Sequence, residues 1–122
     1  MSGLRVSGFP TLTAHSSALD TTLDLGSFND LYIHAAGDDT PDGFPVWRTG
    51  AEEEQRFLFF HLPAARFFIN DRLDMQNHFA WAAAQEHPPT EEIGPVVLGE
   101  NMRWEVFDGK DDVDMLLTVT SG

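Results

Sequence analysis

The sequence predicts an all-β, mostly antiparallel fold, built as a small β-sandwich or barrel. Two apolar runs of strand length, Arg56–His61 and Arg66–Asn70, are separated by a short break, which is the pattern of a β-hairpin. Aromatic residues occupy both alternating faces of the first run, so we expect a central strand covered on both sides. Further short strands with turn residues between them favour a sandwich or barrel around this hairpin.

The segments before the hairpin carry weaker strand signals. Residues 4–13 alternate loosely and are interrupted by Gly8 and Pro10, so we expect a short strand at a sheet edge, where proline is tolerated. Residues 15–17 read as a loop. Three more strands are predicted from alternating apolar positions or closing glycines: residues 22–25, 30–35 and 46–48.

The chain after the hairpin contains one ambiguous segment. Residues 79–85 alternate large and small side chains, which favours a strand, whereas their alanines favour one short helix near residues 75–86 as the alternative. Other strands are predicted at residues 96–98, 102–107 and 115–120. Asp-Gly pairs, which tolerate positive φ, mark two turns: Asp42-Gly43 and Asp108-Gly109.

The length of 122 residues predicts a single domain over residues 1–122. Ten Phe and 42% hydrophobic residues can fill one core without a disulfide framework, since the chain has no cysteine. No apolar stretch reaches the length of a membrane span, and the first residues lack the apolar centre of a signal peptide. These features favour a soluble protein in a reducing compartment, with the cytoplasm preferred.

The net charge of −13 comes from 20 acidic and seven basic residues, of which Lys110 is the single lysine. Such a charge repels nucleic acids and anionic membranes and therefore argues against both as partners. It has three explanations: solubility or a salty environment, an acidic face for a basic protein, or mimicry of a nucleic acid. The acidic residues are scattered in short groups, which counts against mimicry.

A series of aromatic motifs resembles a known family. The motifs follow in this order: Tyr32, residues 43–48 (GFPVWR), residues 56–60 (RFLFF), residues 67–71 (FFIND) and residues 104–109 (WEVFDG). This order is similar to a small β module that recurs in large proteins of protists, algae and marine invertebrates. The resemblance covers residues 32–119, a core module of about 30–120, and departs from the module where a Trp of the second hairpin strand is replaced by Phe67 or Phe68. It implies a β fold and a non-catalytic binding role, and it names no functional residue.

Aromatic residues are the first candidates for a ligand-binding face. Exposed rings suit sugars because they offer an apolar face and a polar edge. The candidates are Tyr32, Trp47, Trp81 and Trp104, and the alternative is that all three tryptophans belong to the core. Arg48, beside Trp47 and just after a Gly/Pro turn, is the preferred polar contact.

Clustered aspartates are weak candidates for calcium, because calcium takes six to eight oxygen ligands. The group comprises Asp108, Asp111, Asp112 and Asp114, and it does not match an EF-hand loop. A solvated turn is the preferred explanation, so no cofactor is predicted beyond this calcium alternative. The five histidines also lack the close spacing of a compact metal motif.

The sequence contains no nucleophile elbow and no phosphate-binding glycine motif, so an enzyme is the least supported class. The preferred function is a non-enzymatic binding module whose ligand is a carbohydrate or a protein surface. One alternative is a structural or assembly subunit of a homo-oligomer or larger complex. The other is an acidic inhibitor or immunity-type protein that caps a basic partner.

Overall fold

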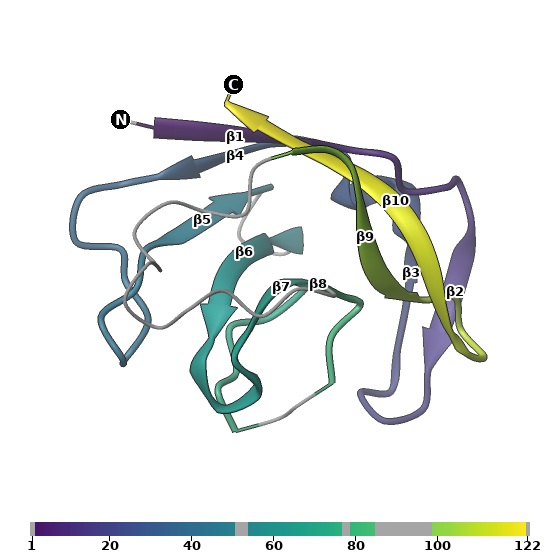
Figure 1. Cartoon of the computed structure of the whole chain (residues 1–122). Helices are drawn as coiled ribbons and strands as arrows, with labels where there is room; N and C mark the ends of the chain where they lie inside the picture. Colours follow the sequence, from purple (N-terminus) through teal and green to yellow (C-terminus); the bar gives the residue numbers. More distant parts are fainter. Residues whose placement is uncertain (1, 51–53, 77–78, 85–98, 122) are drawn as a thin grey trace.

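The computed structural model describes residues 2–50, 54–76, 79–84 and 99–121. Eight strands close into an antiparallel barrel in the order β1-β10-β9-β8-β7-β6-β5-β4 (Figure 1). These strands are β1 (Ser2–Ser7), β4 (Leu31–His34), β5 (Val46–Thr49), β6 (Arg56–His61), β7 (Arg66–Asn70), β8 (Ala82–Ala84), β9 (Gly99–Phe107) and β10 (Asp112–Ser121). A separate two-stranded sheet pairs β2 (Thr13–Ser16) with β3 (Thr21–Asp24). The predicted all-β, antiparallel fold is therefore confirmed, as a barrel.

The barrel is closed by its first and last strands. β1 pairs with β10 through Leu4 opposite Ser121 and Val6 opposite Val119, and it pairs with β4 on its other side. β1 and β10 lie side by side in Figure 1. The prediction that the first strand lies at a sheet edge is wrong, because β1 ends at Ser7, before Pro10, and has a partner on each side.

The β6–β7 hairpin has the bounds that the sequence predicts. Phe59 lies opposite Phe68 and Phe60 opposite Phe67, and all four rings are buried. Alternation directs Phe60 and Phe67 into the barrel, whereas Phe59 and Phe68 face outwards into a second apolar cluster. Part of the segment after β7 packs over that outer cluster through Leu73. The predicted cover on both sides is therefore confirmed.

Large side chains fill the barrel interior. The fully buried residues include Tyr32 from β4, Leu58 from β6 and Trp104 from β9. The short 3-10 helix η1 (Leu25–Phe28), which follows β3, contributes Leu25 and Phe28 to the same cluster. The barrel and the β2–β3 hairpin thus share one core, to which the hairpin contributes Ala14 and Leu23.

Several local expectations need correction. Residues 15–17 are not all loop, because His15 and Ser16 belong to β2. The helix alternative for residues 75–86 is wrong for residues 75–76 and 79–84, which are not helical, and Ala82–Ala84 forms β8. The strand predicted at residues 96–98 lies outside the described residues. Both Asp-Gly turns are confirmed, with φ values of 91° at Gly43 and 100° at Gly109.

Two further points concern the described residues. The short 3-10 helix η3 (Leu62–Ala64) connects β6 to β7, and Ala65 after it adopts a positive φ of 55°. Among the described residues there is no helix that combines the length and the apolar character needed to cross a membrane.

Candidate functional site

A pocket of about 470 Å³ lies on the outer face of the barrel, over β7, β8 and β9. Its lining combines an apolar part with three charged residues. The apolar residues are Ala64, Phe68, Phe79, Ala80 and Ala83, and the charged residues are Arg66, Glu105 and Asp112. The volume is within the usual range for small-molecule binding sites.

The register of three neighbouring strands creates this hollow. Phe68 on β7 lies opposite Ala83 on β8, and Ala83 lies opposite Glu105 on β9. Side chains in one such row point to the same face of the sheet. Because alanine is the small residue between a phenyl ring and a carboxylate, the row is depressed at its centre. The short Ala83 side chain therefore leaves space in the middle of the row, and Ala64 and Ala80 also line the pocket.

Arg66 forms a fixed edge of the pocket. Its Nε donates a hydrogen bond to the carbonyl oxygen of Ala84 at 2.7 Å, and its Nη2 lies 3.3 Å from Oε1 of Glu105. The guanidinium therefore connects β7 to β8 and β9, and it holds the Glu105 carboxylate in one place. Partial burial of both side chains makes this contact less screened than a fully exposed pair.

Asp112, the first residue of β10, adds a second carboxylate. Partial burial raises the pKa of Asp112, and the nearby Glu105 carboxylate raises it further, whereas Arg66 acts in the opposite direction. With Asp112 ionised, one guanidinium faces two carboxylates, so the pocket carries a net negative charge. A cation would relieve the repulsion between these carboxylates.

The outer face of the β9–β10 hairpin continues beyond the pocket. Asp114 lies opposite Glu105 and forms an ion pair with Arg103 at 3.0 Å. The next outward residue on β10 is Leu116, which lies opposite Arg103 and is 56% exposed. We call the pocket, Asp114 and Leu116 together the β7–β10 face. An exposed leucine beside charged groups is a common arrangement at protein-binding surfaces.

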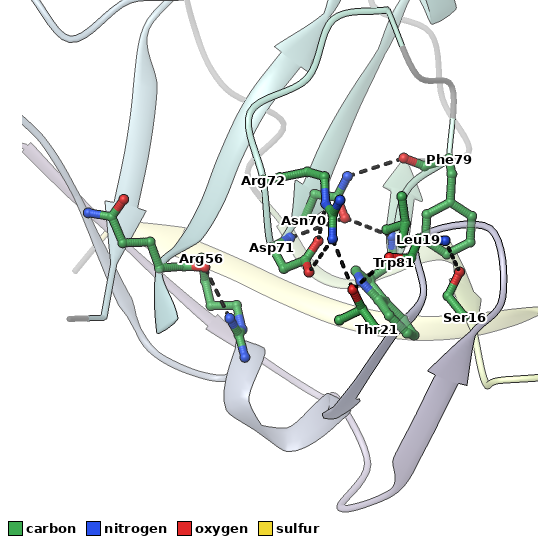
Figure 2. A network of polar contacts seen from close by, with 10 residues as sticks. Ser16, Leu19, Thr21, Arg56, Asn70, Asp71, Arg72, Phe79 and Trp81 are labelled. Atoms are coloured by element: carbon green, nitrogen blue, oxygen red, sulfur yellow. Dashed lines mark hydrogen bonds and ion pairs between the residues drawn. The ribbon is translucent and has the colours of Figure 1, made fainter. Parts of the chain in front are cut away.

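A second pocket, of about 530 Å³, lies between β3 and the adjoining ends of β6 and β7. Figure 2 shows Arg72 between Asp71 and Thr21. The guanidinium contacts both carboxylate oxygens of Asp71 at 3.2 Å and donates to the Thr21 hydroxyl at 3.0 Å. Arg56 donates to the Ser27 hydroxyl and to the Gln55 carbonyl oxygen. These contacts attach the β2–β3 hairpin and η1 to the barrel, which is a structural role.

The predicted aromatic face is not on the surface. Tyr32, Trp81 and Trp104 are fully buried, and Trp47 is only 7% exposed. The Tyr32 hydroxyl donates to the Phe28 carbonyl oxygen at 2.8 Å, and burial raises its pKa. The interpretation of these rings as an exposed stacking surface is therefore wrong, because the closed barrel directs them into its core. The core alternative for the tryptophans is confirmed.

Arg48, the predicted polar contact, has a structural partner. Its Nε and Nη2 each contact one carboxylate oxygen of Asp38 at 2.6 Å, and its guanidinium lies 5.0 Å from the Phe57 ring centre. The side chain is 36% exposed. Arg48 thus attaches the turn before β5 to the barrel. It is distant in sequence from the residues that line the pocket.

The four predicted calcium ligands do not converge on one point, although Asp108 and Asp111 share a turn. The Asp108 carboxylate accepts hydrogen bonds from the backbone N–H groups of Lys110 and Asp111, and these bonds lower its pKa. Asp112 lines the pocket, and Asp114 contacts Arg103. In the part of the chain that the structure describes, no three acidic, histidine or cysteine side chains are grouped for a metal ion.

Apart from Asp112, which the sequence offered as a calcium ligand, the pocket residues were not among the sequence candidates. One available signal was Arg66, a basic residue at the start of an aromatic strand in a chain that has only seven basic residues. The large–small alternation around Ala83 was a second signal. Comparison of the chain with models of protein families, with curated proteins and with solved structures found no match. The resemblance to the small β module therefore stays a prediction.

Proposed function

We propose that this protein is a non-enzymatic interaction module that binds a basic protein surface through the β7–β10 face. The observation that carries the proposal is the negatively charged pocket, whose apolar floor is formed by Phe68 and Ala83 and which adjoins the exposed Leu116. Protein-binding surfaces commonly combine an apolar anchor with a polar rim. This face supplies both on strands that the barrel holds in register.

The charge of the whole chain supports a basic partner. A net charge of −13 attracts cationic surfaces over distances of about a Debye length and accelerates encounter. At contact, Glu105 and Asp112 would meet the basic groups, while Leu116 would bury apolar surface. The partner should therefore associate quickly, and the complex should weaken as salt is added.

The two rival functions receive less support. A carbohydrate site of the expected kind needs exposed Trp or Tyr rings, and the three tryptophans and Tyr32 are buried. An assembly subunit that grows by strand pairing needs a free strand edge. The closed order of the described barrel strands offers none, which leaves the short β2–β3 hairpin for such pairing. A protein partner that contacts the side chains of an outer face needs neither exposed aromatic rings nor a free strand edge.

The test is selection from a random dodecapeptide display library on the immobilised protein, with a glycan array in parallel. We expect enrichment of peptides that carry Lys or Arg next to apolar residues, and we expect their affinity to fall with ionic strength. Neutral peptides, salt-independent binding or a specific glycan as the sole ligand would refute the proposal.

Two leucine variants locate the binding face. Leu116→Ser removes the exposed anchor on β10 and should weaken the selected peptides. Leu12→Ser is the matched control, because Leu12 is 41% exposed on the connection between β1 and β2. Equal effects of the two substitutions would show that the β7–β10 face is not the binding surface.

A further inference from the structure

We propose that the pocket over β7, β8 and β9 receives one lysine side chain of the partner. Its methylene stem would lie on Phe68 and Ala83, and its ammonium group would lie between the carboxylates of Glu105 and Asp112. This inference rests on the proposed function, since it names the partner group that the β7–β10 face recognises.

The apolar part of the pocket suits the stem of a long basic side chain. Lysine buries its methylene groups along apolar surface while its charged end stays with polar partners. The hollow at Ala83 lies between the Phe68 ring and the Glu105 carboxylate in one row of the sheet. A side chain that follows this row would pass from the ring to the carboxylate without leaving the pocket.

The charged part of the pocket favours an ammonium group. Burial and the nearby Glu105 carboxylate both raise the pKa of Asp112, and Arg66 offsets this effect only in part. An ammonium group is a compact charge with three donors, so it can contact two carboxylates from different strands. Its arrival would remove the repulsion that remains between Glu105 and Asp112.

Arg66 gives the pocket a preference for lysine over arginine. Guanidinium groups bind carboxylates best in a planar two-bond contact. Arg66 already contacts Oε1 of Glu105 and is itself fixed by the Ala84 carbonyl oxygen. A second guanidinium would have to compete for the same carboxylate and would place two like charges beside each other. An ammonium group requires only one free oxygen from each acidic residue.

The experiment is a ¹⁵N NMR titration of the full chain with three capped tripeptides that differ only at the central residue. Acetyl-Gly-Lys-Gly-amide should shift the amide signals of Ala83, Glu105 and Asp112. Acetyl-Gly-Arg-Gly-amide should bind about threefold more weakly. This change corresponds to less than 1 kcal/mol, which is usual for a partly exposed charge contact. The peptide with acetylated lysine should produce no saturable shift, because it lacks the charge.

Two aspartate substitutions separate the pocket from general charge effects. Asp112→Asn should weaken the lysine peptide by about threefold to tenfold. Asp42→Asn removes the same charge from an exposed turn outside the pocket lining and outside the β7–β10 face, so it should leave the affinity within a factor of about two. Retained dispersion of the amide signals would show that each variant is folded.

The outcomes distinguish this inference from the proposed function. Equal or tighter binding of the arginine peptide, shifts confined to other surfaces, or equal effects of the two aspartate substitutions would overturn the lysine pocket. Failure of the lysine peptide to bind, while library-selected basic peptides still bind, would also overturn it and leave the proposed function standing. If the library also yields no basic peptide, the proposed function fails as well.

Discussion

Replacing Trp104 by Phe should change the stability of the barrel very little. Trp104 is 1% exposed, and its indole N–H has no hydrogen-bond partner among the described residues. Losing part of the buried ring should cost about 1 to 2 kcal/mol. Removing a buried donor that has no acceptor should return about 1 to 3 kcal/mol. The two effects oppose each other, so we expect a net change in unfolding free energy within about 1 kcal/mol.

A smaller deletion should have a larger effect. Tyr32→Phe removes a single oxygen atom, but the hydroxyl donates to the buried carbonyl oxygen of Phe28 at 2.8 Å. The variant leaves that carbonyl without this partner, which should cost about 1 to 3 kcal/mol. Trp104→Ala serves as the opposite control, since loss of the whole side chain should cost about 3 to 5 kcal/mol.

The assay is urea unfolding followed by far-ultraviolet circular dichroism, which does not depend on the removed indole. The free energies of unfolding should decrease in the order Trp104→Phe, Tyr32→Phe, Trp104→Ala. A cost above about 1 kcal/mol for Trp104→Phe would mean that packing outweighs the unpaired donor. A neutral Tyr32→Phe would mean that its hydrogen bond contributes nothing net. Either result would refute the reasoning.

Three further predictions concern the barrel closure, a turn and the pocket. Gly8→Ala should lower the melting temperature, because Gly8 has a φ of 108° and an added Cβ would lie 2.8 Å from the Leu116 carbonyl oxygen; an unchanged melting temperature would contradict this. A double-mutant cycle of Arg48→Met and Asp38→Asn should give a coupling of about 0.5 to 1 kcal/mol that shrinks in 1 M salt, and a salt-independent coupling would argue against an ion pair. Asp112 has a raised pKa, so its ionisation opposes folding as pH rises through the folded-state pKa. Asp112→Asn should therefore be more stable than the parent at neutral pH and equal to it in acid, as urea unfolding at both pH values can test.

The β6–β7 hairpin was predictable because its sequence leaves little choice. Phe57 and Phe59 alternate with Leu58 and Phe60, and a strand with apolar groups on both faces has to be covered twice. The break at Leu62 then sets the turn. The alternation of β9 and the Thr-Val-Thr residues of β10 also indicated strands, although the structure begins both earlier than predicted, at Gly99 and Asp112. Closure was less predictable, because pairing of β1 with β10 joins segments from the two ends of the sequence.

The pocket was hidden from the sequence for a related reason. Phe68, Ala83 and Glu105 become neighbours only when the register of three strands is known. Periodicity places a residue on one of two faces, but it does not tell which face of a barrel strand lies inside. The tryptophans illustrate this limit. The sequence pattern allowed Trp47 and Trp104 to be exposed or buried, and the closed barrel places both in the core.

Closure by β1 and β10 also has a consequence for folding kinetics. The β6–β7 hairpin joins residues that are near in sequence, whereas Leu4 must find Ser121 from the opposite end of the chain. Loop-closure entropy delays such distant pairs, so we expect the hairpin to form early and the β1–β10 seam to form last. Gly8→Ala at the seam should then accelerate unfolding and leave the refolding rate nearly unchanged in stopped-flow experiments. The same seam completes the ring of strands, so separation of β1 from β10 would open the barrel.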